Sequence, residues 1–172
     1  KVSVITGASK GIGKSIAKKF AFEGSKVSIC SRTSSKKEGL KVVDEIVKNG
    51  GEAIYSSVDV SKYNEVEKLI QKTIDEWGKI DILVNNAALT YFVPIKDYVL
   101  KRWLKSWEVN LHAPFYLSHL VLGDMIAKSS GSIVNISSAA AVGPGSGPYG
   151  DDNNEDIQNK PKRQGGGTCY GA

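Results

Sequence analysis

Apolar and polar positions along the chain fall into two alternating patterns. In the first pattern, several apolar or small residues follow each other with little interruption, as in strands of a parallel sheet that is covered on both faces. Five short runs of this kind lie at residues 2–6, 26–30, 52–58, 81–85 and 132–137. We expect each of them to form a β-strand.

Between these runs, apolar residues recur three or four positions apart, which is the spacing of a helix with one buried face. Such segments lie at residues 12–21, 40–47, 66–77 and 97–127. Gly24, Gly50 and Gly78 follow the first three segments and are typical of helix ends. Ser61 precedes the third segment, and we expect its side chain to cap that helix.

Strands that alternate with helices predict right-handed crossovers and a parallel sheet. The predicted fold class is α/β, a Rossmann-like doubly wound parallel sheet in three α/β/α layers. Such a sheet needs a sixth strand, but Gly, Pro, Asp, Asn and Lys dominate from residue 143 onward. We therefore expect the later strands to be missing from this chain. Residues 1–142 would form an incomplete Rossmann domain, and residues 143–172 a polar Gly/Pro-rich loop or insertion.

Charge and composition narrow the class of protein. The formal net charge is +5, but the lysines are spread over several predicted helices, which is typical of a solvated surface rather than a nucleic-acid site. No apolar run approaches the roughly 20 residues that span a bilayer, and no leader segment precedes the first strand. We expect a cytoplasmic protein with no membrane or nucleic-acid partner. Cys30 and Cys169 lack disulfide or metal-ligand spacing, so no metal site is predicted.

The turn TGASKGIG joins the first predicted strand to the first helix. Its glycines permit a tight turn and a close approach of backbone to phosphate, and the helix N-terminus attracts a pyrophosphate. We therefore predict that this turn binds a dinucleotide, through Gly7, Ser9, Lys10, Gly11, Ile12 and Gly13. Tight packing of helix on strand is the simpler alternative.

A phosphate-binding loop of the nucleotide-triphosphatase type is a rival interpretation of the same turn. Gly13, Lys14 and Ser15 match the end of its G-x-x-x-x-G-K-[ST] pattern. The first glycine of that pattern would fall on Ala8, and no strand ending in a clear Walker-B aspartate is evident. The dinucleotide interpretation is therefore favoured.

Five ordered motifs together resemble the short-chain dehydrogenase/reductase family. They are the glycine turn, Asp59-Val60, the segment NNAA at residues 85–88, the segment VNL at residues 109–111, and IVNISS, which ends at Ser138. The family has NNAG where this chain has NNAA, so Ala88 replaces a glycine. The resemblance covers residues 1 to about 142 in the family's order and spacing.

The resemblance implies NAD(P)-dependent hydride transfer to or from a small-molecule carbonyl or alcohol. Asp59 and Val60 would contact the adenine, and Asn86 and Ala87 would lie against the cofactor. Ser138 would hold the substrate oxygen, and Asn110 would hold a water that links the family's lysine to solvent. The alternative is a non-catalytic NADP-binding protein of the same fold, acting as a sensor or scaffold. Singly, Asn86 and Asn110 have a simpler interpretation as residues that tie down loop backbone.

Two tyrosines compete for the role of proton donor that the resemblance implies. Tyr149 lies 11 residues after Ser138, near the family's usual separation, but Asn153 stands where the family has a lysine. Tyr170 begins the segment YGA, which resembles the start of the family's Tyr-Gly/Ser-Ala-Ser-Lys. We therefore favour Tyr170 as catalytic, with Tyr149 as the alternative and residues 150–166 as an inserted surface loop.

The end of the second strand predicts NADP(H) rather than NAD(H). NAD enzymes place an acid here to bind the ribose 2′-hydroxyl, whereas an arginine accommodates a 2′-phosphate. This chain has Ser31 followed by Arg32, and Lys10 adds a second positive charge. A solvated strand-end arginine is the simpler alternative.

Residues 115–127 predict self-association. Their apolar residues occupy more than one stripe of the helix, which is more than packing on one sheet face requires: Phe115, Leu117, Leu120, Val121, Leu122, Met125 and Ile126. In the family this helix pairs between subunits, which implies a homodimer or homotetramer. A fully buried helix in a monomer is the alternative.

Overall fold

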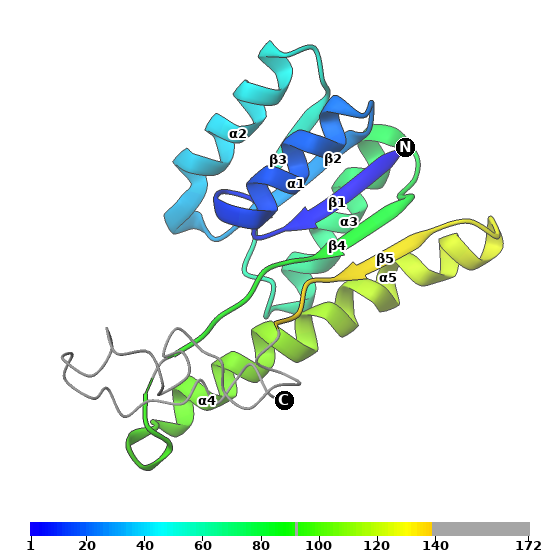
Figure 1. Cartoon of the computed structure of the whole chain (residues 1–172). Coiled ribbons are helices and arrows are strands. Elements are labelled where there is room, and N and C mark those ends of the chain that lie inside the picture. Colours follow the sequence, from blue (N-terminus) through cyan, green and yellow to red (C-terminus); the bar gives the residue numbers. More distant parts are fainter. Residues whose placement is uncertain (92, 139–172) are drawn as a thin grey trace, which may run out of the picture.

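The computed structural model describes residues 1–91 and 93–138, and its centre is a five-stranded parallel sheet (Figure 1). The strand order is β3-β2-β1-β4-β5. The strands are β1 (Val2–Thr6), β2 (Lys26–Ser31), β3 (Ala53–Ser57), β4 (Ile82–Asn85) and β5 (Ser132–Asn135). The first three strands extend the sheet to one side of β1, and the chain then crosses back to add β4 and β5 on the other side, as in Rossmann folds. The predicted α/β class and parallel sheet are therefore confirmed.

Helices cover both faces of the sheet (Figure 1). One face carries α1 (Gly11–Phe22) and α2 (Lys36–Lys48), and the other carries α3 (Tyr63–Trp77) and α5 (Ala113–Ala127). Each face has its own core, with Ile5, Ile29 and Val84 on the first side and Val4, Leu69 and Leu83 on the second. Full burial of each such side chain contributes about 1.5–3 kcal/mol.

The helix predicted at residues 97–127 is divided. Asp97 ends a short 3₁₀ turn, η2 (Ile95–Asp97), and α4 begins only at Leu100 and runs to Trp107. A π-helical turn, η3 (Glu108–His112), then joins α4 to α5 without a break. Pro114 lies in the first turn of α5. Because proline lacks an N–H and its ring clashes with the carbonyl four residues earlier, it disfavours regular α-helix at this point.

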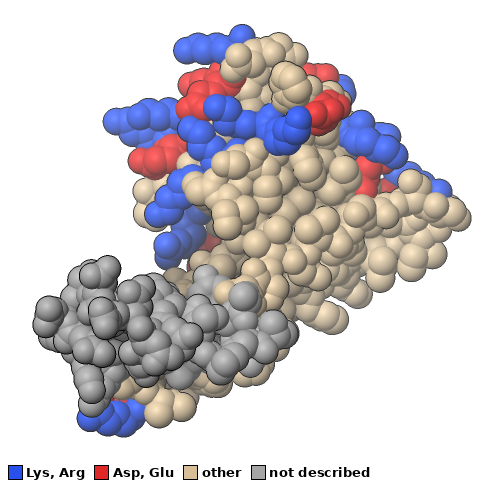
Figure 2. Space-filling view, in the orientation of Figure 1, with Lys and Arg blue, Asp and Glu red and all other residues tan. Residues whose placement is uncertain are grey.

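The β5 edge is less covered than the rest of the sheet. Ile133 is half-buried, whereas the other β5 residues are exposed. Figure 2 shows a broad uncharged surface on this side of the molecule, below the lysine-rich region of α1 and α2. The site residues discussed next lie at the carboxyl edge of the sheet, where β1, β2, β3, β4 and β5 all end.

Candidate active site

The glycine turn between β1 and α1 is shaped by close backbone contacts. Gly7 and Gly11 have φ values of +65° and +57°, a region that favours glycine. A Cβ atom on Gly13 would lie 2.5 Å from Asn86 Nδ2 and 2.7 Å from the Gly7 carbonyl oxygen. A Cβ atom on Gly7 would lie 2.8 Å from the Cα of Ala87. Gly7 and Gly13 therefore leave room for the loop that follows β4, which a side chain at either position would displace.

Asn86 and Thr6 fix this turn to the β4 loop. Asn86 Nδ2 donates to the carbonyl oxygens of Thr6 (2.8 Å) and Gly7 (3.3 Å). The Thr6 hydroxyl oxygen accepts from the backbone N–H groups of Asn86 and Ala87, each at 3.0 Å. Thr6 was not among the site residues predicted from the sequence. The sequence feature that could have indicated Thr6 is a polar residue at the end of an apolar strand, directly before the turn.

The N-terminus of α1 is open to a ligand. No described side chain caps it, its N-cap residue is Lys10, and its first turn contains no acidic residue. Its first amide groups therefore present unpaired N–H donors and the positive end of the helix dipole. Ser9 is buried beneath the turn, whereas Lys10, Gly11 and Ile12 are exposed. This end of the helix is suited to a pyrophosphate.

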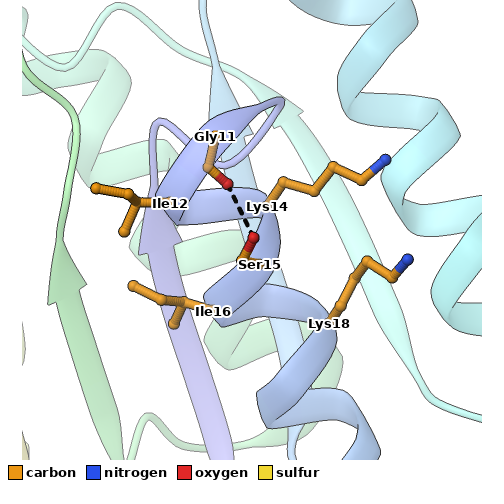
Figure 3. Close-up of a pocket in the computed structure, with 6 residues that line it drawn as sticks. All are labelled: Gly11, Ile12, Lys14, Ser15, Ile16 and Lys18. Carbon is orange, nitrogen blue, oxygen red and sulfur yellow. Dashed lines mark hydrogen bonds between the residues drawn. The ribbon is translucent and has the colours of Figure 1, made fainter.

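Figure 3 shows a shallow pocket along the first two turns of α1, with Ile12 and Ile16 on one side and Lys14 and Lys18 on the other. Both lysines pair with Glu45 of α2, at 2.8 Å and 3.0 Å. Lys14 thus bridges two helices, whereas the lysine of a P-loop would reach phosphates. The geometry gives no support to the rival nucleotide-triphosphatase interpretation.

The end of β2 places Ser31 and Arg32 in different surroundings. Ser31 is 7% exposed, and its hydroxyl lies 3.1 Å from Tyr55 Oη and 3.3 Å from the Ser35 carbonyl oxygen. Arg32 is exposed and has no ion pair among the described residues. Arg32 is therefore available to a ligand at the carboxyl edge, while Ser31 is engaged with the protein. Contact of either residue with the cofactor stays a prediction.

Asp59 and Val60 form the start of the loop between β3 and α3. Val60 is buried, and Asp59 Oδ1 accepts from the Ser61 N–H (3.1 Å) and hydroxyl (2.7 Å). Burial alone would raise the pKa of Asp59, but hydrogen bonds from Ser61 and Lys105 hold that pKa below its usual value. The prediction that Ser61 caps α3 is wrong. The helix begins at Tyr63, and the Ser61 hydroxyl is used by Asp59 instead.

Asn110 lies in the π-helical turn and holds the β4 loop. Its Oδ1 accepts from the Leu89 N–H at 2.8 Å, and its Nδ2 donates to the Leu89 carbonyl oxygen at 2.9 Å. These two hydrogen bonds agree with the simpler interpretation, in which Asn110 ties down loop backbone. A primary amide has a further donor hydrogen and a further lone pair, so a water can still bind.

The ends of β4 and β5 are aligned by a pair of asparagines. Asn85 Nδ2 donates to Asn135 Oδ1 at 2.8 Å, and the Ile136 N–H donates to the Asn85 carbonyl oxygen at 2.9 Å. Ser138 follows at the same edge of the sheet and is half-buried. Ser138, Asn86, Asn110 and the glycine turn thus belong to one edge. Tyr149, Tyr170 and the predicted boundary at residue 142 lie outside the described residues.

The described residues offer neither a metal site nor a cysteine nucleophile. Within residues 1–91 and 93–138, no three His, Cys, Asp or Glu side chains gather closely enough to hold a metal ion. Burial raises the pKa of the Cys30 thiol to about 12, so this cysteine is a core residue and not a nucleophile. The described helices include no candidate for a membrane-spanning segment.

Comparison with known proteins decides the family. The short chain dehydrogenase family model matches residues 1–150, which is most of the chain. The protein belongs to this family. The resemblance inferred from the motifs is confirmed, and the fold of the five strands agrees with it.

Individual members of the short chain dehydrogenase family match over most of this chain but only part of their own length. A short chain dehydrogenase from Pseudocercospora fijiensis is 38% identical over 146 residues, covering 84% of this chain and 47% of that protein. A 3-oxoacyl-[acyl-carrier-protein] reductase from Synechocystis sp. is 38% identical over 150 residues, covering 86% and 60%. The chain thus spans about half the length of these curated relatives.

A solved structure shows the same relation. A metagenomic short-chain oxidoreductase in complex with NADP superposes with a TM-score of 0.79 at 36% sequence identity. The match covers 84% of this chain and 65% of that one. The Rossmann-like architecture is therefore that of the family, and the roles assigned to individual site residues stay predictions.

Proposed function

We propose that the complete protein is an NADP(H)-dependent oxidoreductase that transfers a hydride between the nicotinamide and a small-molecule carbonyl or alcohol. The observation that carries this proposal is the uncapped N-terminus of α1 above a glycine turn that Asn86 and Thr6 hold in place. Glycines occur in this turn where a Cβ would meet the β4 loop, and the free amide groups suit a pyrophosphate. The residues therefore fit a dinucleotide.

The binding roles follow from the position of each group. The amides of Gly11, Ile12 and Gly13 would bind the pyrophosphate, with Ser9 and Lys10 beside them. Asp59 and Val60 would lie against the adenine, and Arg32 would pair with a 2′-phosphate. Asn86 and Ala87 would lie against the cofactor next to the glycine turn. The bound dinucleotide supplies the hydride chemistry, and the protein supplies orientation and a proton.

Ser138, Asn110 and Tyr170 would act on the substrate side. Ser138 would hydrogen-bond the substrate oxygen at the carboxyl edge of the sheet. Asn110 would hold a water with the part of its amide that Leu89 does not use. Tyr170 would exchange a proton with the substrate oxygen, which requires its pKa, ordinarily about 10, to approach neutrality. The names of the relatives support a carbonyl substrate, since one is a 3-oxoacyl-[acyl-carrier-protein] reductase.

Cofactor preference gives a direct test of Arg32. The full-length protein should bind NADPH about tenfold or more tightly than NADH, because the exposed guanidinium pairs with the 2′-phosphate. Arg32→Ala should weaken NADPH binding by about tenfold and leave NADH binding nearly unchanged. Calorimetric titration with each nucleotide measures both effects.

Lys48→Ala is the matched control, because Lys48 is an exposed cation at the far end of α2. Its affinities for both nucleotides should equal those of the wild type. Equal affinities of the wild type for NADPH and NADH, or an Arg32→Ala protein that retains full NADPH affinity, would refute the preference.

The outer face of α5 supports a homodimer or homotetramer. Leu117, Val121 and Met125 are buried against the sheet. Phe115 and Ile126 are each 66% exposed, and Leu122 is exposed as well. Large apolar side chains gathered on one exposed helix face are typical of an interface between subunits. We therefore expect the intact protein to self-associate through α5.

Light scattering at micromolar concentration should give the mass of a dimer or tetramer. The double variant Phe115→Ser/Ile126→Ser should shift the protein toward monomer, because it removes apolar area from the interface. Phe22→Ser is the control, since Phe22 is 82% exposed on α1, a helix on the other face of the sheet. A monomeric wild type would contradict the expectation.

A further inference from the structure

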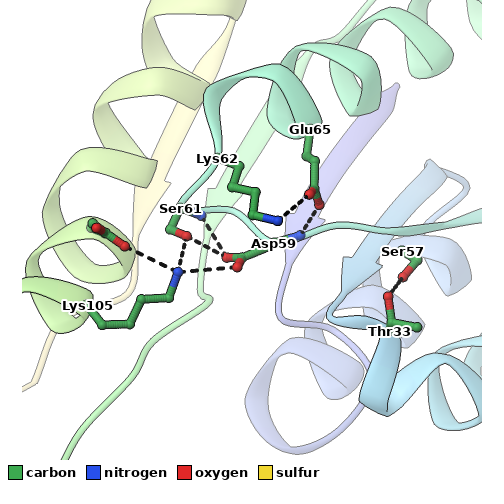
Figure 4. Close-up of polar contacts among 8 residues, drawn as sticks. Thr33, Ser57, Asp59, Ser61, Lys62, Glu65 and Lys105 are labelled. Atoms are coloured by element: carbon green, nitrogen blue, oxygen red, sulfur yellow. Dashed lines mark hydrogen bonds and ion pairs between the residues drawn. The ribbon is translucent and has the colours of Figure 1, made fainter. Parts of the chain in front are cut away.

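Lys105 of α4 is the centre of a polar network that joins two separate parts of the site (Figure 4). Its ammonium group contacts Asp59 Oδ2 at 3.2 Å, the Ser61 hydroxyl, and Glu108 Oε2 at 3.2 Å. An ammonium group has three N–H donors, so these three acceptors satisfy it. Asp59 and Lys105 are 46 residues apart in sequence.

The loop after β3 is held in place from both sides of Asp59. The Asp59 backbone N–H donates to Glu65 Oε2 at 2.7 Å, which ties the loop to the first turn of α3. The Asp59 carboxylate accepts from Ser61 on one oxygen and from Lys105 on the other. Of these bonds, only the one from Lys105 connects the loop to α4. The loop also lies beside the end of β2, where the Val58 N–H donates to the Ser31 carbonyl oxygen at 2.9 Å.

The helix that carries Lys105 leads directly to Asn110. Residues from Leu100 through the π-helical turn to Ala127 form one continuous helical segment. Asn110 lies in that turn, and both ends of its side-chain amide bond the backbone of Leu89. One helical element therefore touches the β3 loop through Lys105 and the β4 loop through Asn110.

We propose that Lys105 is a positioning residue for the cofactor: through Asp59 and Ser61 it fixes the loop after β3 on the helix that carries Asn110. The affinity for the adenosine half of the cofactor then depends on a lysine that lies on α4 and not in the glycine turn. This inference rests on the proposed function, because it assigns the β3 loop to the adenosine half.

The network is more than an isolated surface ion pair. The side chains of Lys105 and Asp59 are 34% and 26% exposed, so both are partly withdrawn from water. Burial alone would lower the pKa of Lys105, but hydrogen bonds to Glu108 and Asp59 raise it, so the group stays charged at neutral pH. A single exposed ion pair contributes about 0–1 kcal/mol to the free energy of unfolding. Several charged groups that share hydrogen bonds restrict the positions of their side chains more strongly than one pair does.

The test uses full-length protein and 2′,5′-ADP, a probe that carries the adenosine half of NADP with its 2′-phosphate and its 5′-phosphate but no nicotinamide. Calorimetric titration should show that Lys105→Met weakens binding by about tenfold. Lys105→Arg, which keeps the charge and its donors, should stay within about threefold of the wild type. Lys101→Met is the control, because Lys101 is an exposed lysine on the same helix with no ion pair among the described residues. It should bind like the wild type.

A second measurement, amide hydrogen exchange without ligand, reports on the loop itself. Lys105→Met should speed exchange at residues 59–62, and Lys105→Arg should restore most of the protection. The inference is overturned if Lys105→Met binds 2′,5′-ADP like the wild type, or if its loop exchanges at the wild-type rate. It is also overturned if Lys105→Arg loses as much affinity as Lys105→Met, because a positive charge at this position would then not support binding.

The two proposals fail in different ways. If the wild-type protein does not bind 2′,5′-ADP at all, the proposed function fails, and the exchange measurement still shows whether Lys105 holds the loop. If the wild type binds and the Lys105→Met protein binds equally well, the proposed function stands and the role of Lys105 is refuted.

Discussion

Tyr170→Phe in the full-length protein should lower the rate of hydride transfer by about 100- to 10,000-fold, the usual contribution of a general acid–base group. Phe keeps the aromatic ring and removes only the hydroxyl, which in our proposal exchanges a proton with the substrate oxygen. Tyr149→Phe, made in parallel, should leave the rate within about threefold of the wild type. Steady-state rates at saturating NADPH measure both.

The reason for preferring Tyr170 lies in the neighbouring residues. Asp151 and Asp152 follow Tyr149 closely, and their negative charges would oppose the phenolate that catalysis needs. Tyr170 is followed by Gly171 and Ala172, which begin the pattern that opens the family's catalytic helix. Residues 150–166 would then be an inserted loop, whose length costs little because closure entropy grows by only about 0.6 kcal/mol per doubling.

The two variants and the wild type together separate three outcomes. Loss of hydride transfer in Tyr149→Phe alone would show that spacing from Ser138 is the better guide and that residues 150–166 are not an insertion. Loss in Tyr170→Phe alone would support the proposal. A wild-type protein that binds NADPH but transfers no hydride to any carbonyl tested would favour the non-catalytic alternative.

Gly13→Ala should reduce NADPH affinity by about tenfold or more and lower the free energy of unfolding by about 1–3 kcal/mol, the usual cost of overpacking. The new methyl group would lie 2.5 Å from Asn86 Nδ2 and 2.7 Å from the Gly7 carbonyl oxygen. It therefore displaces the amide that holds the glycine turn. Calorimetric titration and chemical denaturation measure the two effects.

Gly123→Ala is the control for Gly13→Ala. Gly123 lies in the interior of α5, and no described atom comes within 4 Å of a Cβ built there. Because alanine favours a helix over glycine, this substitution should raise the free energy of unfolding by roughly 0.5–1 kcal/mol and leave NADPH binding unchanged. A Gly13→Ala protein with wild-type affinity and stability would show that the turn tolerates a side chain.

Much of the fold follows from local patterns in the sequence. Apolar runs identified all five strands within a few residues. For β1 and β2 the reason is that a strand buried on both faces needs apolar or small side chains at nearly every position, whereas β3 and β5 are less buried. Glycines marked the ends of the first three helices and the turn after β1, because a positive φ disfavours other residues. The family was evident from five motifs in order, and the family match confirmed it.

Other features depended on contacts that no local pattern encodes. Ser61 was expected to cap α3. Its hydroxyl instead donates to the neighbouring Asp59 and accepts from Lys105, which lies 44 residues away in sequence. The sequence predicts ordinary helix where the π-helical turn carries Asn110, because the helical spacing of apolar residues continues through this turn.

Local sequence patterns were thus enough to predict the strands and helices along the chain, the glycine turn and the family, since each is expressed within a few neighbouring residues. How the turn and the β3 loop are held became visible only in the folded structure. Asn86 lies 80 residues from Thr6, and Lys105 lies 46 residues from Asp59. Hydrogen bonds across such separations exist only after the parallel sheet has brought the carboxyl ends of its strands to one edge.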